Sequence, residues 1–113
     1  MTAPRTVAAV SSASTAARRR DPYVDAGELL KALSAPVRLA IVTHLSDCGP
    51  LCVHELVDRL GVPQPLVSQH LRVLRSAAIV AGERRGREVA YTLADEHVAH
   101  IVADAVAHVQ EQA

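Results

Sequence analysis

Residues 53–75 read VHELVDRLGVPQPLVSQHLRVLR, and this stretch decides the fold. In its first eight residues apolar side chains recur at i, i+3, i+4 and i+7, which predicts an amphipathic helix that Gly61 ends. A second helix follows after only Gly61-Val62-Pro63, with Val67, Leu71 and Leu74 on its inner face. Pro63 stands at its expected N-cap, where Ser or Asp is usual. Two short helices joined by a tight turn indicate a helix-turn-helix.

The hydrophobic period changes after this second helix. Residues 79–93 are rich in Val, Ile, Tyr and Thr, and Glu83-Arg84-Arg85-Gly86-Arg87 interrupts them. Two short strands around a glycine turn predict a β-hairpin with arginines at its tip. A hairpin directly after a helix-turn-helix is the wing of a winged helix. We therefore expect a mainly α fold with a small β-hairpin, a winged helix-turn-helix.

Further helices are predicted on both sides of this unit. Helical signals begin at Asp21 and resume after Pro36, and Asp47-Cys48-Gly49-Pro50 breaks the second of these helices. Residues 94–113 form a last helix with one apolar stripe, made of Val98, Ile101, Val102, Ala105 and Val109. Because this helix lies outside the helix-turn-helix and the wing, we expect it at the interface of a dimer. Residues 1–20 are expected to be a disordered tail, and residues 21–113 a winged-helix DNA-binding and dimerisation domain.

Size and composition set the class of protein. The chain has 113 residues, 12 basic and 12 acidic, and it lacks Phe and Trp, so its core is modest and burial against a second copy would help it. Two cysteines are too few for a disulfide framework, and no apolar run is long enough for a membrane span. A cytoplasmic protein without a membrane partner is expected. Without a phosphate loop or a His-Glu-x-x-His helix, an enzyme is not expected.

The charges are unevenly distributed. Residues 64–91 carry five arginines and two glutamates, a net charge of +3, whereas residues 94–113 carry four acidic side chains and no Lys or Arg. A basic middle suits the polyanionic backbone of double-stranded operator DNA. Gln, Ser and His near the groove floor can read bases, while arginines meet phosphates or the minor groove. The predicted DNA-binding residues are Gln64, Ser68, Gln69, His70, Arg72, Arg75, Arg84, Arg85 and Arg87.

Four segments together resemble one known family, the ArsR/SmtB metalloregulators. These are 33–41 (LSAPVRLAI), 51–56 (LCVHEL), 67–74 (VSQHLRVL) and 86–91 (GREVAY). They resemble the family's opening segment, the approach to its helix-turn-helix, its recognition helix and its wing. The resemblance covers about residues 27–111. It implies a homodimer through the first and last helices that binds an operator in response to metals or other signals.

The last helix carries a candidate metal site. His108 and Glu111 are i, i+3 and share a face, while Asp95 and His97 converge only where the helix begins. His97 and His108 lie about 16 Å apart along the axis, so one helix cannot wrap all four ligands around one ion. Two antiparallel copies can, with Asp95 and His97 of one chain beside His108 and Glu111 of the other. The same spacing resembles the interfacial site of the family's zinc sensors.

Two imidazoles and two carboxylates suit zinc, nickel or cobalt rather than Cu(I). Zinc takes four ligands, whereas nickel prefers more, and His100 or Glu96 could complete its shell. The sequence leaves open which of these metals is the signal, and whether its binding represses or activates.

Rival interpretations centre on the cysteines and the wing. Some family members bind soft metals through Cys-x-Cys, but here the pair is Cys52-Val53-His54, so Cys52 is expected to be an inert thiol. Control by redox state or by a partner protein, rather than by metal, is the alternative within DNA-binding regulators. A winged interaction module that does not read DNA is the alternative outside them.

Overall fold

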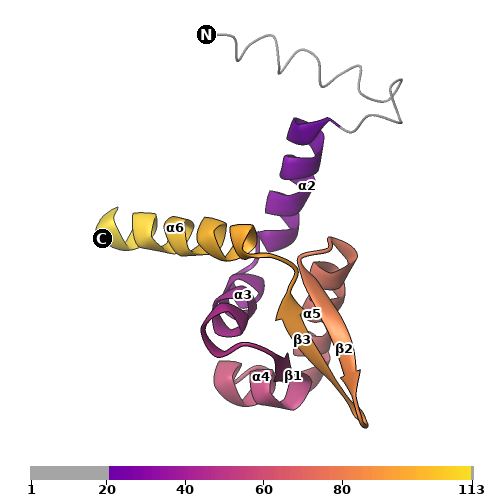
Figure 1. Ribbon diagram of the computed structural model, residues 1–113. Helices are drawn as coiled ribbons and strands as arrows, with labels where there is room; N and C mark the ends of the chain where they lie inside the picture. The colour runs from indigo at the N-terminus through magenta and orange to yellow at the C-terminus, as the bar shows by residue number, and fades with distance from the viewer. Residues whose placement is uncertain (1–20, 113) are drawn as a thin grey trace, which may run out of the picture. The chain divides into compact units, whose positions relative to one another are not determined.

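The computed structural model describes residues 21–112, so the tail predicted at residues 1–20 lies outside the described part. The elements run in the order α2 (Pro22–Leu33), α3 (Pro36–Cys48), β1 (Leu51–Cys52), α4 (Val53–Leu60), α5 (Gln64–Ser76), β2 (Val80–Arg85), β3 (Glu88–Leu93) and α6 (Glu96–Gln112) (Figure 1). The chain divides into two units between Lys31 and Ala32.

The first unit contributes most of α2. Asp21 begins this helix because its carboxylate Oδ1 accepts hydrogen bonds from the amides of Tyr23 at 2.7 Å and Val24 at 3.3 Å. Pro22 fits the first turn, where its missing N–H is not needed. Tyr23, Val24 and Leu30 are exposed, so α2 carries apolar side chains on its surface.

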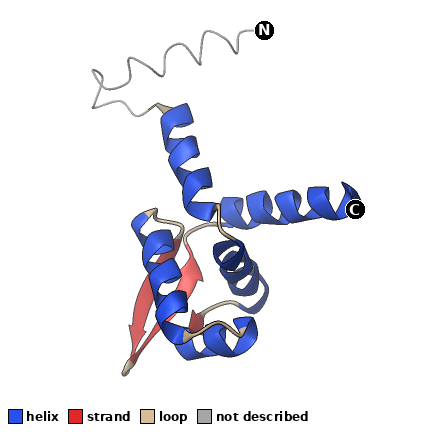
Figure 2. Ribbon diagram, turned by 180° about the vertical axis from the view of Figure 1, so that it is seen from behind, coloured by secondary structure: helices blue, strands red, loops and turns tan. Residues whose placement is uncertain are grey.

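The core of the second unit lies among α3, α4, α5 and the sheet. The side chains of Ile41, Val42, Leu56, Val67 and Leu74 are fully buried, and Leu71 is nearly so. The inner face predicted for the second helix of the helix-turn-helix is therefore confirmed. These buried aliphatic side chains hold α5 so that its opposite face remains exposed (Figure 2).

The turn between α4 and α5 also follows the sequence. Gly61 ends α4 in the left-handed conformation at φ 67°, with its amide donating to the carbonyl of Val57 at 2.9 Å. Pro63 stands at the N-cap of α5 with no side-chain cap, as predicted. Its carbonyl instead accepts the amides of Leu66 and Val67, which supports the first turn of α5 through the backbone.

The sheet has one strand more than the sequence predicts. Its order is β1-β3-β2, and β1 pairs antiparallel with β3 through Leu51 with Tyr91 and Cys52 with Ala90. A strand of two residues is too short to show alternation, and the break signals of Asp47–Pro50 directly precede it. This pairing attaches the hairpin to the start of α4.

The wing itself is longer than expected. The predicted interruption at residues 83–87 shrinks to the two-residue turn Gly86-Arg87, because Glu83, Arg84 and Arg85 continue β2 opposite β3. Gly86 turns the chain at φ 63°, a conformation that L side chains rarely adopt. The fold is a winged helix-turn-helix, as predicted, and its arginine-bearing tip lies at the end of the hairpin farthest from α6 (Figure 1).

Helix α6 packs on α3 but buries only part of its predicted stripe. Val98 and Val102 are buried, whereas Ile101, Ala105 and Val109 are exposed. The stripe therefore has two parts, one that packs against the rest of the second unit and one that is exposed. Within residues 21–112 no single helix is long and apolar enough to cross a membrane, and only α2 with α3, as a bent pair, reaches that length and composition.

Candidate DNA-binding interface and metal-ligand positions

The exposed face of α5 carries most of the predicted base-reading residues. Gln64, Gln69, Arg72 and Arg75 are exposed, while Ser68 is half-buried on the same helix. The buried inner face of α5 sets this arrangement, because the residues between its buried positions must project outward. Side chains that end in amides, a hydroxyl and guanidinium groups thus share one solvent-facing surface.

The arginines of this surface and of the wing are available to a ligand. Within the described residues no ion pair or side-chain hydrogen bond engages Arg72, Arg75, Arg84 or Arg87. Arg85 lies 3.9 Å from the carboxylate of Glu83, and both side chains are more than half exposed, so this pair is weak. Cations without partners on α5 and on the wing form a surface suited to phosphates.

His70 differs from the other predicted DNA contacts. It is half-buried, and its ring nitrogen Nδ1 lies 3.2 Å from the guanidinium Nη1 of Arg38 in α3. The Nε of Arg38 donates in turn to the carbonyl of Ala32 at 2.6 Å. Arg38 is absent from the DNA-binding residues predicted from the sequence. One signal was present, since Arg38 is the only Lys or Arg in α3.

The wing is linked to the start of α4 by a cluster around Glu88. The Nδ1 of His54 lies 3.5 Å from the carboxylate of Glu88. The hydrogen bond from the Cys52 thiol to this carboxylate, together with partial burial, raises the pKa of Cys52 above its ordinary value. Glu55 secures the same junction, since its side chain accepts the Cys52 amide at 2.8 Å. This cluster connects β1 and α4 to the strand that carries the wing.

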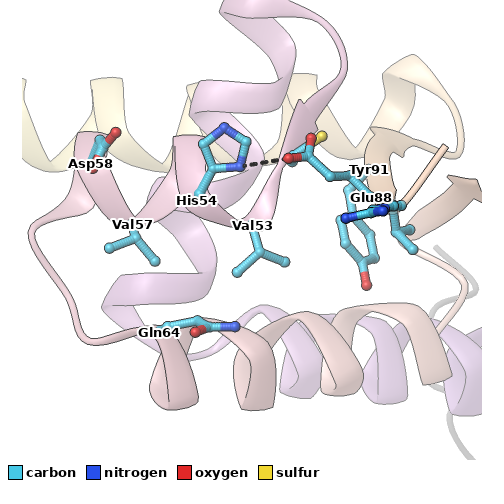
Figure 3. Close-up of a pocket in the computed structure, with 10 residues that line it drawn as sticks. Val53, His54, Val57, Asp58, Gln64, Glu88 and Tyr91 are labelled. Carbon is cyan, nitrogen blue, oxygen red and sulfur yellow. Dashed lines mark ion pairs between the residues drawn. The ribbon is translucent and has the colours of Figure 1, made fainter. Parts of the chain in front are cut away.

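A hollow of about 450 Å³ adjoins this cluster, between α4, the start of α5 and β3. Figure 3 shows Val53 and Val57 between the His54–Glu88 pair and Gln64. Arg87 also lines it, so two predicted DNA-binding residues, Gln64 and Arg87, border one depression. The hollow therefore lies beside the predicted DNA-reading face.

The predicted metal ligands lie at the two ends of α6. Asp95 precedes the helix and accepts the amide of His97 at 2.9 Å, and its Oδ1 lies 3.7 Å from the His97 Nδ1. His108 and Glu111 are exposed in the last turns, and the possible extra ligands Glu96 and His100 are exposed near the first. Asp95 and His97 are thus neighbours, as expected.

One chain does not gather a metal site by itself. Among residues 21–112 no three His, Cys, Asp or Glu side chains are grouped so as to hold an ion. Asp95 with His97 and His108 with Glu111 remain two separate half-sites, and their union across two chains stays a prediction.

The comparisons with known proteins agree with this architecture. Residues 35–81 match the family described as "Bacterial regulatory protein, arsR family". The HTH-type transcriptional repressor SmtB of Mycobacterium tuberculosis is 67% identical over 88 residues, which cover 78% of this chain and 64% of SmtB. The HTH-type transcriptional regulator NmtR of the same species is 46% identical over 79 residues, which cover 70% of this chain and 65% of NmtR.

A solved structure gives the same result for the fold. The homodimeric winged helix-turn-helix DNA-binding domain Mb0332 from Mycobacterium bovis superposes with a TM-score of 0.71 at 27% identity, covering 80% of this chain and 82% of that one. The matched part spans less than two thirds of the length of SmtB and NmtR. The family and these relatives are regulators rather than enzymes, as the sequence predicts. The chain belongs to the ArsR family of bacterial regulatory proteins.

Proposed function

We propose that this chain is a transcriptional regulator that binds operator DNA as a homodimer and responds to a transition metal. The observation that carries the DNA-binding part is the exposed polar face of α5 beside arginines that have no partner within the described residues. A helix of this kind enters the major groove, and the wing then reaches the adjacent backbone. A cytoplasmic location is part of this proposal, because a regulator that binds operator DNA acts where that DNA lies. The names of SmtB and NmtR as a repressor and a regulator support the same role.

Uncovered apolar surface supports the homodimer. Tyr23 and Leu30 on α2 are more than half exposed, as is Val109 on α6. Large exposed aliphatic and aromatic side chains on two helices that lie outside the DNA-reading unit favour burial against a second copy. The family resemblance implies contact through the same two helices.

The donor atoms on α6 fit a divalent transition metal. Asp95 and His97 are adjacent in the structure, and both side chains are exposed, the imidazole by 91%. Asp95 uses Oδ1 as the helix cap, which leaves Oδ2 free to coordinate. With His108 and Glu111 of the partner subunit, two imidazoles and two carboxylates would hold zinc, cobalt or nickel. His100 and Glu96 would extend the shell for nickel.

A metal held this way would act by linkage. An ion between the two α6 helices favours one relative orientation of the two DNA-binding surfaces of the dimer. Operator DNA favours the orientation in which both surfaces contact it. If the orientations differ, metal and DNA weaken each other's binding by the same factor. Repression relieved by metal is the form that the resemblance implies.

Control by thiol oxidation is less well supported. Its readiest candidate, Cys52, is half-buried, and its thiol donates a hydrogen bond to the Glu88 carboxylate, which raises the thiol pKa and keeps the thiolate fraction low. Cys48 is exposed, but nothing within the described residues links it to the wing or to α5.

Calorimetry would test the metal site first. We expect Zn(II) or Ni(II) to bind the metal-free protein at about one ion per chain, and the His97→Ala/His108→Ala variant to lose this binding. Asp104→Asn is the matched control, because Asp104 is an exposed carboxylate on the same helix that belongs to neither half-site. Binding that survives in the double variant would refute the site and direct attention to Cys52 and His54. A chain that stays monomeric at micromolar concentration would refute it as well.

A further inference from the structure

Arg38 joins two parts of the second unit through one guanidinium group. Its Nε donates to the carbonyl of Ala32 at 2.6 Å, and its Nη1 contacts His70 Nδ1 at 3.2 Å. Ala32 lies in the last turn of α2, Arg38 in the first turn of α3, and His70 in the middle of α5. One side chain therefore connects the α2–α3 junction with the recognition helix.

The contact gives the two nitrogen atoms defined hydrogen-bonding roles. A guanidinium group has only donors and does not lose its proton in proteins, so the Nδ1 atom must accept. An imidazole that accepts at Nδ1 is neutral and carries its hydrogen on Nε2. A doubly protonated ring could not accept this hydrogen bond and would place a second positive charge beside Arg38.

The bond has no substitute on α5. Within the described residues it is the only hydrogen bond by which an α5 side chain reaches another element. The inner face of α5 otherwise rests on aliphatic contacts through Val67, Leu71 and Leu74, which are non-directional. A charge-assisted hydrogen bond adds a directional constraint on the rotation of the helix about its axis.

We propose that Arg38 is a positioning residue for DNA reading, which holds α5 through the Nδ1 of a neutral His70 so that the neighbouring residues Gln69 and Arg72 face the groove. The inference rests on the proposed DNA-binding function. It gives His70 a role inside the protein, as the acceptor for the Arg38 guanidinium. His70 is predicted from the sequence to read bases, but its partner Arg38 is not predictable from local sequence.

Long-range ¹H–¹⁵N NMR on the full chain tests the protonation state without DNA. We expect His70 to show an unprotonated Nδ1 and a protonated Nε2, and Arg38→Gln to shift the Nδ1 resonance. A protonated Nδ1, or two tautomers in equal exchange in the wild type, would overturn the proposal whatever the variants do.

Operator affinity tests the positioning. The probe is a duplex that the wild-type protein selects from a random 30-base-pair library, with binding measured by fluorescence anisotropy. Arg38→Gln and His70→Leu should each weaken binding by about tenfold, and the double variant should be no weaker than either one. His70→Gln should recover most of the affinity, because its amide oxygen can accept from Arg38.

The controls separate the possible failures. Lys31→Gln removes one positive charge close to Ala32 without removing a contact to α5 and should bind within twofold of the wild type. If the wild type selects no duplex, the proposed function fails. If it selects one but Arg38→Gln and His70→Leu bind it normally, only the present inference fails. Should Arg38→Gln lose its fold, Arg38→Lys, which keeps the charge but not the two-way contact, takes its place with the same expected loss.

Discussion

Asp95 and His97 are held together at the start of α6 by two relationships. The carboxylate Oδ1 of Asp95 accepts the His97 amide at 2.9 Å and lies 3.7 Å from the His97 Nδ1. The same oxygen also lies 3.4 Å from the amide of Val98, which completes a helix N-cap. One carboxylate therefore begins the helix and stands beside the imidazole proposed to bind metal with it.

The two roles of Asp95 should separate in a pair of variants. Asp95→Ala should lower the free energy of unfolding by about 1 kcal/mol, because it leaves α6 without its cap, and should also weaken metal binding. Asp95→Asn keeps a capping oxygen, so it should change stability by only a few tenths of a kcal/mol while it still weakens metal binding. Urea titration of the metal-free protein and calorimetry with Zn(II) measure the two effects. Equal stability loss in both variants would contradict the capping role.

Gly61 should be costly to replace. Its φ of 67° ends α4, and a Cβ there would meet no neighbouring atom, so Gly61→Ala should cost about 1 kcal/mol through backbone strain alone. Gly27 is the matched control, since it lies inside α2 with open space around it. Gly27→Ala should leave stability unchanged or raise it by up to about 1 kcal/mol. Chemical denaturation measures both, and a neutral Gly61→Ala would contradict the strain.

The two cysteines should differ in reactivity. The raised pKa of Cys52 predicts slower alkylation by iodoacetamide at pH 8 than at the exposed Cys48. Glu88→Gln removes the carboxylate that favours the thiol, so Cys52 should then react faster, while Cys48 stays as the internal control. Peptide mass spectrometry over time measures both rates. Equal rates at the two sites in the wild type would contradict the contact with Glu88.

The raised pKa of Cys52 also predicts how the stability of the fold depends on pH. Because the folded-state pKa of Cys52 is raised, the protonated thiol stabilises the fold at pH values below the pKa of the unfolded chain. That contribution should disappear as the pH rises through the folded-state pKa. Denaturant titrations from pH 7 into the alkaline range should show a smaller loss of stability in Cys52→Ser than in the wild type. If the free energy of unfolding of the wild type falls with pH no more steeply than that of Cys52→Ser, the predicted contribution of Cys52 is contradicted.

The wing arginines should act through charge. Arg84→Ala should weaken binding to the selected duplex and lower the slope of log K against log salt by about one, as expected for one lost phosphate contact. Arg72→Ala should also weaken binding. Lys31→Gln again serves as the charge-matched control. Unchanged binding by both arginine variants would favour an interaction module that does not read DNA.

Several elements were predictable from local sequence because their causes are local. The helix-turn-helix follows from apolar spacing, from a glycine that tolerates positive φ and from a proline that restricts the next turn. The hairpin follows from strand-forming residues around Gly86. The closeness of Asp95 and His97 follows from their place at a helix start, where an aspartate accepts the amide two residues ahead.

Other features depend on residues far apart in the chain, which no local pattern records. β1 exists because Leu51 and Cys52 pair with β3 about forty residues later, and its two residues carry too little periodicity to be seen. The stripe predicted for α6 divides into a buried and an exposed part because packing on α3 and β3 covers only one side of the helix. The sequence shows an apolar side chain but not which surface will cover it.

The clearest division between sequence and structure lies in the histidines. Local sequence placed His70 on the recognition helix, but only tertiary packing brings the guanidinium of Arg38 in α3 to 3.2 Å from its Nδ1. His54 is likewise paired with Glu88 only because β1 carries the start of α4 to the wing. Spacing determines which side chains share a helix face, because the helix repeat is a local property. The hydrogen bond that each of them makes is decided by the fold, because its partner comes from a distant segment.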